Sequence, residues 1–324
     1  MSILITSLKL TGALIATLAG SGAMYQYVAT KLDEKAYPPI GKMVDIGGYK
    51  LHMIDRGVGG PTVVIDAGGG DNSLDWSLVQ PEIAKFTRVV VYDRAGYAWS
   101  NASSLERTSE NIAKELHTML HNANIPAPYI LVGHSFGGIN VRFFANMYPD
   151  EVAGVVLVDS SHEDQGKNAP ASAEQEMNRY YYEKLMRTAL GIFRLSQYTP
   201  SGQIKFKKSI ALSKFSPEIQ EIYFAQKFTT KRALALLQES SCKTQSFKQL
   251  KNMKNMLGDK PLIVITLASR KDKEDIALHA DLVTKSSRGK LVFADNSGHN
   301  VNYDQPEIIV EAVREMVEEL RNEK

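Results

Sequence analysis

A serine framed by glycines is the first residue in this sequence whose surroundings point to chemistry. Residues 133–137 read Gly-His-Ser-Phe-Gly, a G-x-S-x-G pattern, and an apolar run over 129–132 leads into it. The helical pattern that follows completes the order strand, sharp turn and helix, which is the setting of a nucleophile elbow. Small residues permit such a tight turn. We therefore predict that the Ser135 hydroxyl stands exposed at the carboxyl edge of a sheet, with the positive end of a helix behind it.

A base is needed beside this serine, because a hydroxyl is a poor nucleophile until its proton is removed. We assign this role to His299, which lies in a polar loop between the last strand pattern and the final helix pattern. His162 and His279 remain conceivable, although the first begins a long insertion and the second belongs to a helix-like stretch. The remaining histidines are less suitable. His52 lies in a predicted hairpin, His117 and His121 lie in a predicted surface helix, and His134 is too close to the turn to face Ser135.

The third member of such a site is a carboxylate that orients the imidazole and stabilises its charged form. Asp159 ends a strand pattern on the same predicted sheet edge as Ser135, and Asp272 follows the next strand pattern. Either aspartate gives the chain order serine, acid, histidine that this arrangement requires. The site also needs two backbone N–H groups for the developing oxyanion, and the residue after the serine, Phe136, supplies one of them.

These residues require a sheet whose strands alternate with helices. Short β-branched runs bounded by glycine, proline or aspartate predict buried parallel strands; they lie at 62–66, 88–93, 129–132, 155–159, 262–267 and 290–293. A hairpin is predicted over 42–56 around a Gly-Gly pair, and residues 306–323 have the pattern of an amphipathic helix. The rhythm predicts an α/β fold with a mostly parallel central sheet and helices on both faces.

A long insertion interrupts this rhythm. Residues 161–260 are helical and rich in aromatic side chains, and they carry 17 Lys and Arg against 9 Asp and Glu, a charge of +8, whereas the rest of the chain has −6. We predict that they form an inserted helical cap on an α/β core made of residues 41–160 and 261–324. The aromatic side chains of such a cap suit a pocket for an apolar group.

The first 35 residues are not part of the predicted core. Residues 10–30 carry no charged side chain, and about 20 apolar residues are enough for a helix to cross a bilayer. We therefore favour a retained membrane anchor within residues 1–35. A cleaved export signal is the alternative, since residues 21–23 read Ser-Gly-Ala, a small-residue cleavage pattern. Lysines on both sides of the segment leave its orientation open.

The composition of the 324-residue chain excludes several classes of function. With 38 basic and 36 acidic side chains the net charge is only +2, so the chain has no overall field to hold nucleic acid and we predict no such partner. Cys242 is the only cysteine, which excludes an internal disulfide framework and a cysteine-clustered metal site. A hydrophobic content of 44% provides for a sizeable core.

Together the motifs resemble those of the α/β-hydrolase superfamily, from about Gly41 to the C-terminus. Besides the serine turn, residues 93–100 read Asp-Arg-Ala-Gly-Tyr-Ala-Trp-Ser. This is similar to the family's D-x-x-G-x-G-x-S segment, with Ala98 in place of the second glycine. Gly298 and His299 precede the last helix, as the resemblance requires. Three matches in the family's order make the resemblance specific.

The resemblance bears on the acid and on the oxyanion site. Most members carry the acid after the strand that follows the cap, but a minority carry it at the end of the strand before the cap. The usual glycine-acid ending is missing after Leu267, so the resemblance favours Asp159 over Asp272. It also assigns the second oxyanion donor to the backbone N–H of Gly69, in a loop where Ala67 replaces the family's usual histidine.

The function that this resemblance implies is a serine hydrolase that needs no cofactor or metal. It would cleave small-molecule carboxylic esters of apolar acyl or alcohol groups through an acyl-enzyme on Ser135. Epoxide hydrolases and haloalkane dehalogenases are similar in fold but use an aspartate at the elbow, so Ser135 argues against both. Lactonases, amidases and lyases can share the same triad. A non-catalytic binding protein is the alternative of another class, and the intact Ser135 and His299 argue against it.

The predicted N-terminal anchor and the basic cap suggest a common orientation toward a membrane. If the N-terminal segment is an anchor, the basic cap could face the bilayer, where each basic side chain near anionic lipid contributes about 1 kcal/mol. The side chains expected nearest the head groups are Lys205, Lys207, Lys208, Lys248, Lys251 and Lys254. A solvated basic surface is the alternative interpretation of the same residues.

Overall fold

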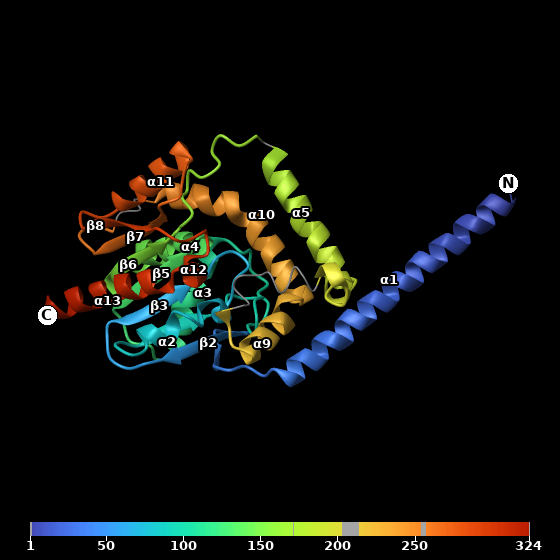
Figure 1. The fold of residues 1–324 in the computed structure, drawn as a ribbon, viewed down its shortest axis with the longest axis horizontal. Helices are drawn as coiled ribbons and strands as arrows, with labels where there is room; N and C mark the ends of the chain where they lie inside the picture. The colour runs from blue at the N-terminus through green and yellow to red at the C-terminus, as the bar shows by residue number, and fades with distance from the viewer. Residues whose placement is uncertain (1, 171, 203–213, 254–256, 324) are drawn as a thin grey trace.

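An eight-stranded sheet forms the centre of the computed structural model, which describes residues 2–170, 172–202, 214–253 and 257–323 (Figure 1). The strand order is β1-β2-β4-β3-β5-β6-β7-β8. The bounds are β1 (Lys42–Asp45), β2 (Lys50–Arg56), β3 (Thr62–Asp66), β4 (Val89–Tyr92), β5 (Tyr129–His134), β6 (Val152–Val158), β7 (Leu262–Leu267) and β8 (Gly289–Ala294). β2 pairs antiparallel with β1 and β4, and the other strand pairs are parallel. The predicted mostly parallel α/β sheet is confirmed.

β6 begins earlier than its sequence pattern indicates. Val152 pairs with Tyr129 of β5, and the register then shifts by one residue so that Gly154 lies opposite Ile130. The small residues Ala153 and Gly154 hid this part of the strand, because they lack strand propensity. Gly154 has a packing role, since a Cβ atom there would lie 2.5 Å from Met316 Sδ of the last helix.

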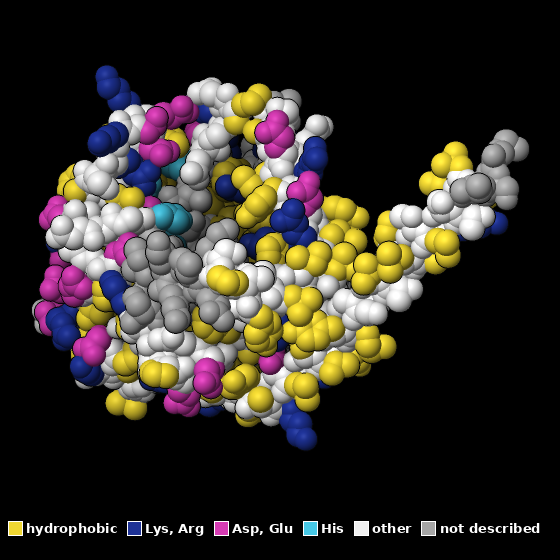
Figure 2. Space-filling model, turned by 45° about the vertical axis from the view of Figure 1, so that its right-hand side comes forward, with side chains coloured by type: hydrophobic (Ala, Val, Ile, Leu, Met, Phe, Trp, Pro, Cys, Tyr) yellow, Lys and Arg dark blue, Asp and Glu magenta, His cyan; other side chains and the backbone are white. Residues whose placement is uncertain are grey.

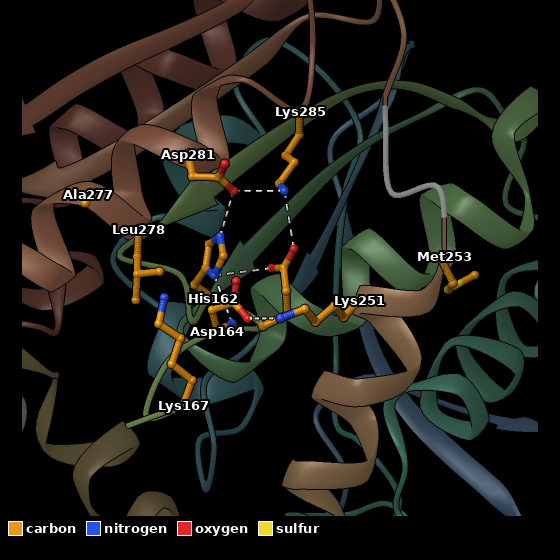
Figure 3. A pocket seen from close by; sticks show the side chains of 10 residues that line it. His162, Asp164, Lys167, Lys251, Met253, Ala277, Leu278, Asp281 and Lys285 are labelled. Atoms are coloured by element: carbon orange, nitrogen blue, oxygen red, sulfur yellow. Dashed lines mark hydrogen bonds and ion pairs between the residues drawn. The ribbon is translucent and has the colours of Figure 1, made fainter. Parts of the chain in front are cut away.

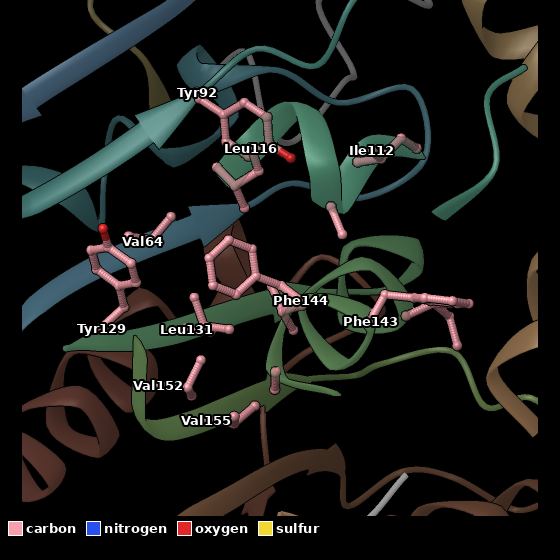
Figure 4. Close-up of a cluster of buried hydrophobic side chains, with 14 of the residues drawn as sticks. Val64, Tyr92, Ile112, Leu116, Tyr129, Leu131, Phe143, Phe144, Val152 and Val155 are labelled. Carbon is pink, nitrogen blue, oxygen red and sulfur yellow. The ribbon is translucent and has the colours of Figure 1, made fainter. Parts of the chain in front are cut away.

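Helices cover both faces of the sheet. α3 (Ser109–Asn122), α4 (Phe136–Met147) and α11 (Lys273–Val283) lie on one face, whereas α2 (Gln80–Ile83) and α13 (Pro306–Asn322) lie on the other. Alternate strand residues supply the two cores: Val64 and Leu131 belong to the first, and Val63 and Ile130 to the second. Figure 4 shows the first core, where Phe144 of α4 lies between the strands and α3. Three short helices complete this part: η1 (Ser73–Trp76), η2 (Pro149–Glu151) and α12 (Val301–Asp304).

The described structure places four helices in the chain between β6 and β7. They are α5 (Ser172–Ala189), α6 (Ile192–Ser196), α9 (Pro217–Lys227) and α10 (Thr230–Asn252). In Figure 1 they lie together beside the sheet, between it and α1, and α10 packs along α5. α10 also reaches the core, where Ser246 Oγ accepts a hydrogen bond of 2.9 Å from Ser109 N in α3. We refer to residues 161–260 as the cap; its boundaries stay a prediction.

The N-terminal segment is a single helix, α1 (Ser2–Ala36), whose two halves have different surroundings. Side chains 4–18 are exposed, and Figure 2 shows hydrophobic side chains along this projecting part. The second half packs on the cap: Gln26 is buried and donates to Phe228 O at 2.6 Å, and Asp33 pairs with Arg194 of α6 at 2.6 Å. Among the described residues α1 is the one helix long and apolar enough to cross a membrane.

The lysines expected near lipid head groups are only partly within the described structure. Lys248 is exposed on α10, whereas Lys251 pairs with Asp164 at 2.6 Å and so has a partner in the protein. The other four lie outside the described residues: Lys205, Lys207, Lys208 and Lys254.

Candidate active site

Ser135 occupies the sharp turn between β5 and α4. Its φ of +51° lies in the left-handed region, which residues other than glycine rarely adopt. The backbone is held there because Ser135 N donates to Val158 O of β6 at 3.1 Å and Ser135 O accepts from Ser161 N at 2.9 Å. Strained backbone that is held in this way recurs at functional turns.

Three glycines make this turn possible. A Cβ atom on Gly133 would lie 2.6 Å from the Cα of Gly138, and one on Gly137 would lie 2.3 Å from Asp66 O. On Gly138 it would lie 1.9 Å from Ser160 Oγ. None of these positions has room for a side chain, so the glycines let β5, α4 and the end of β3 approach one another closely.

His299 lies in the loop between β8 and α12. Its Nδ1 is 2.6 Å from Asp159 Oδ2, and its backbone O is 2.9 Å from His134 Nε2. Asp304 Oδ2 accepts from Gly298 N at 3.0 Å and so fixes the loop from the other side. Within the described parts of the chain the Ser135 hydroxyl makes no hydrogen bond with His299; such bonds are often long before a substrate is bound.

Asp159 follows β6 directly and points toward His299. Its φ is +38°, and its side chain is 2% exposed. Burial would raise the pKa of this carboxyl, but the hydrogen bond with His299 and the charge of Arg270 outweigh it, so the pKa lies below its ordinary value. Arg270 Nη2 contacts Asp159 Oδ1. Asp159 is therefore a carboxylate at neutral pH, as the orienting member of a triad must be.

The other candidates lie in different surroundings. Asp272 is the N-cap of α11, where it accepts a hydrogen bond of 2.9 Å from Asp275 N; in the described structure it does not contact His299. His279 Nε2 is 3.8 Å from Asp159 Oδ1, but burial, aided by the charge of Arg270, lowers the pKa of His279 to about 4. His162 is engaged with Asp281, as described below. The structure thus brings together Asp159 and His299 and leaves Asp272 apart.

Gly69 and Phe136, the two expected oxyanion donors, lie next to each other. A Cβ atom on Gly69 would be 3.7 Å from Phe136 Cβ. Both residues and Ser135 line a cavity of about 190 Å³. The opposite wall comes from the cap and combines apolar and polar side chains: Met177, Tyr181, Leu236, Glu239, Ser240 and Lys243. The cavity therefore lies where the cap meets the sheet edge.

A buried arginine that sequence reasoning did not assign to the site supports the loop containing Gly69. Arg94 donates to Ala67 O at 2.6 Å and to Gly68 O at 2.8 Å. It also pairs with Asp66 at 2.6 Å and with Glu239 of α10 at 2.8 Å. Burial opposes its charge, but the two carboxylates raise its pKa well above the ordinary value, so it stays charged. Its place within the motif 93–100 was the available signal.

A second group of titratable side chains lies where the cap begins (Figure 3). His162, Glu163 and Asp281 come close enough together to suggest a metal site. Lys285 already occupies the position of a cation, because its Nζ is 2.8 Å from Asp281 and 3.3 Å from Glu163. Both ring nitrogens of His162 have hydrogen-bond partners: Nε2 is 2.9 Å from Asp281 Oδ2, and Nδ1 accepts from Asp164 N. The cluster is an internal ion-pair network, and we assign no metal to it.

Comparison with known proteins gives three results. The family model described as alpha/beta hydrolase fold matches residues 61–306. A curated relative, the uncharacterized protein YqjL of Bacillus subtilis, is 25% identical over 274 residues, which cover 83% of this chain and 88% of the relative. Two solved structures share the fold. A thermophilic esterase from Thermogutta terrifontis has a TM-score of 0.61 and 20% identity, and the match covers 86% of this chain and 98% of the esterase. The epoxide hydrolase CorEH has a TM-score of 0.63 and 17% identity, and the match covers 86% of this chain and 98% of that protein.

Proposed function

Because the chain belongs to the α/β-hydrolase fold family, we propose that it is a serine hydrolase in which Ser135 attacks the carbonyl carbon of a carboxylic ester. The observation that carries the proposal is the 2.6 Å contact between His299 Nδ1 and Asp159 Oδ2, at the sheet edge that bears Ser135. A carboxylate on one imidazole nitrogen leaves the other, Nε2, to accept the proton of the serine.

The proposed reaction has two steps. Ser135 Oγ attacks the ester while His299 Nε2 takes its proton, and the N–H groups of Gly69 and Phe136 stabilise the negative charge on the substrate oxygen. His299 then returns the proton to the leaving alcohol, which leaves an acyl group on Ser135. In the second step His299 removes a proton from water, and the hydroxide attacks the acyl carbon, so that the acid is released and Ser135 recovers its proton.

An ester with an apolar acyl or alcohol group is the substrate that we infer. Support comes from the cap wall of the cavity, where Met177, Tyr181 and Leu236 provide an apolar surface. Support also comes from the elbow itself, since a serine there forms an ester intermediate that water can hydrolyse through the same histidine. Tyr181 of α5 is half-buried and lines this cavity.

We also infer that α1 holds the protein at a membrane. Fifteen exposed residues, 4–18, extend for about 22 Å at the rise of an α-helix, which is less than the roughly 30 Å of a bilayer core. The first part of the docked half would therefore lie within or near the head-group region. The cap, which contacts this half, would then be close to the lipid surface, where apolar esters concentrate.

A fluorophosphonate probe tests the proposal, because it reacts with a serine only when a neighbouring base activates it. The full chain in a neutral detergent should be labelled at Ser135 and should hydrolyse p-nitrophenyl esters, with a rate that depends on acyl chain length. Ser135→Ala should lose both properties while its circular dichroism and melting temperature stay unchanged, because the hydroxyl of the half-buried Ser135 lines the cavity and contributes little packing. Wild-type protein that neither labels nor turns over these esters would refute the proposal.

A further inference from the structure

A second cavity lies within the cap, and its charge is unusual. It has a volume of about 570 Å³ and is lined by residues of α5, α6, α9 and α10 and by Thr199, Ser201 and Gly202, which follow α6. Four cationic side chains line it: Lys184, Arg187, Lys227 and Arg232. None of its described lining residues is acidic. A concave site with several positive charges and no carboxylate is built for an anion.

These cations lack the partners that other cap cations have. Arg179 pairs with Glu183, Arg194 with Asp33 and Lys251 with Asp164. By contrast, in the described structure none of the four cations that line the cavity forms an ion pair with a carboxylate. Arg187 is exposed, but Lys184 and Lys227 are half-buried and Arg232 is buried. The charge of Asp71 attracts Arg232, but no ion pair joins the two in the described structure. Buried or half-buried charges without a contacting carboxylate are costly, and a bound anion would lower this cost.

Arg232 is the most buried of the four. It is 8% exposed, and its only hydrogen-bond acceptor among the described residues is the carbonyl oxygen of Gly70, which is 3.1 Å from Nε. Nη2 contacts the same oxygen. The remaining donors of this guanidinium are available to a ligand, and a guanidinium binds carboxylate or phosphate oxygens in pairs.

The positive charges in the cavity contribute to lowering the pKa values of its two lysines. Burial, together with repulsion from Arg232 and Lys227, lowers the pKa of Lys184 to about 8. Burial and the charge of Arg232 also lower the pKa of Lys227, and the attraction of Asp75 and Asp71 offsets this only in part. A bound anion would raise both pKa values, because it would offset the repulsion between these cations.

The rest of the lining is apolar, and the cavity adjoins the proposed catalytic site. Phe193 and Phe228 contribute apolar wall, which suits a hydrocarbon chain attached to the anion. Arg232 lies one helical turn before Leu236 and two turns before Ser240, both of which line the cavity of Ser135. These spacings correspond to about 6 and 12 Å along α10. Residues 67–71, which we call the oxyanion loop because Gly69 is the proposed donor, contact both cavities: Gly69 lines the first, and Gly70 O accepts from Arg232 of the second.

We propose that this cavity, which we call the cationic cap pocket, binds the carboxylate or phosphate of an amphiphilic substrate whose ester carbonyl reaches Ser135. The proposal rests on the serine hydrolase function and specifies its substrate class: an ester that bears an anionic group at the far end of a hydrocarbon chain. Arg232 and the two lysines bind the anion, and the chain follows α10 toward the oxyanion loop.

Matched esters test the proposal on the full chain in neutral detergent. The p-nitrophenyl monoesters of succinic, adipic, suberic and sebacic acid carry a terminal carboxylate, and the p-nitrophenyl esters of the monoacids of equal length do not. We expect kcat/KM for the anionic ester to exceed that for its neutral partner by about tenfold at the best chain length, as one charge-assisted contact would give. Added salt should reduce this ratio. A ratio of one or less at every chain length would overturn the proposal.

Variants locate the effect. Lys184→Gln and Lys227→Gln should each lower the anionic-to-neutral ratio by several fold, and Lys184→Glu should lower it further, because it adds a repulsive charge. Lys248→Gln removes an exposed lysine of α10 outside the pocket and is the matched control. Pocket variants that keep the wild-type ratio would refute the assignment of this cavity.

Binding without turnover separates this proposal from the hydrolase function. Calorimetry on Ser135→Ala should detect octanoate and octyl phosphate, and octanol much more weakly; inorganic phosphate distinguishes the contribution of the anion from that of the chain. Lys184→Gln in the Ser135→Ala background should weaken octanoate binding. If fluorophosphonate does not label the wild-type protein but octanoate binds in this charge-dependent way, the hydrolase function fails and the pocket stands. Equal binding of octanoate and octanol would refute the pocket.

Discussion

At the scale of single residues, two aspartates with equivalent sequence positions have different surroundings. Asp159 is buried between His299, Arg270 and His279, and its lowered pKa keeps it ionised. Asp272 is exposed at the start of a helix and bonds only to the backbone of its own first turn within the described structure. The chemistry of the proposed triad therefore requires the first aspartate and not the second.

Replacing each aspartate by asparagine gives opposite expectations. Asp159→Asn should lower kcat by up to about 10⁴-fold, because the amide favours the wrong imidazole tautomer. Asp272→Asn keeps a good helix cap and should change kcat and the free energy of unfolding very little. Steady-state hydrolysis of a p-nitrophenyl ester and urea unfolding measure both. A large loss of kcat in Asp272→Asn with little loss in Asp159→Asn would reassign the acid.

Protonation of the Glu163 carboxyl should affect the free energy of unfolding. Burial would raise its pKa, but Arg142, whose Nη2 is 2.7 Å away, helps to lower it to about 2, against 4.5 when unfolded. A depressed carboxyl pKa stabilises the fold above the unfolded value, and this contribution is lost as the pH falls toward 2. The loss amounts to about 3 kcal/mol at most.

The difference in the free energy of unfolding between wild type and Glu163→Gln should therefore be large at pH 6 and should shrink between about pH 4.5 and pH 2. Urea unfolding at several pH values measures it. Glu183→Gln, which changes an exposed ion pair of α5, is the control. A difference that does not change over this pH range would contradict the lowered pKa.

At the scale of elements, α10 is the part of the cap that supports the proposed site. Glu239 reaches from the middle of this helix to Arg94, and Tyr97 OH donates to the same carboxylate at 2.8 Å. Arg94 in turn holds the two carbonyls of the oxyanion loop. The conformation of the loop therefore depends on where the cap helix packs, although the two segments are far apart in the chain.

Removal of this buried charge tests the dependence. Glu239→Gln leaves Arg94 with Asp66 as its only carboxylate partner among the described residues, and it should cost about 3 to 5 kcal/mol of unfolding free energy. It should also reduce kcat, because the donor loop is less well held. Urea unfolding and ester hydrolysis measure the two effects, and Glu183→Gln should cost less than about 1 kcal/mol. An unchanged free energy of unfolding in Glu239→Gln would show that the ion pair between Arg94 and the cap does not contribute to stability.

At the scale of the whole molecule, α1 is both a projection and a structural element. Its exposed half is apolar, whereas its second half is held by Gln26, by Asp33 and by a close helix contact. A Cβ atom on Gly22 would lie 2.5 Å from Leu190 O, so the two segments approach as closely as glycine allows. The projecting half of α1 is therefore joined to the cap through the docked half of the same helix (Figure 1).

Two truncations separate these roles. A chain that starts at Ala19 should leave the membrane fraction, remain soluble without detergent and keep its ester hydrolysis, because the docked half is retained. A chain that starts at Lys35 should have a lower melting temperature, since it exposes the cap surface that Gln26 and its neighbours cover. Fractionation, thermal unfolding and activity measure this. Equal melting temperatures for both chains would show that docking of α1 contributes nothing to stability.

Local patterns determined much of this protein. Glycine spacing around Ser135, β-branched runs and the polar loop of His299 depend on residues that are neighbours in the chain, so the sheet, the elbow and the histidine position could be predicted from the sequence. The residues alone left the choice between Asp159 and Asp272 open, because both follow a strand, and only the family resemblance favoured Asp159; packing decides which carboxylate contacts the imidazole. The support of the oxyanion loop by Arg94 and Glu239, the docked half of α1 and the cationic cap pocket also needed the tertiary structure. Each joins segments distant in sequence, and burial and electrostatics between such segments leave no local pattern.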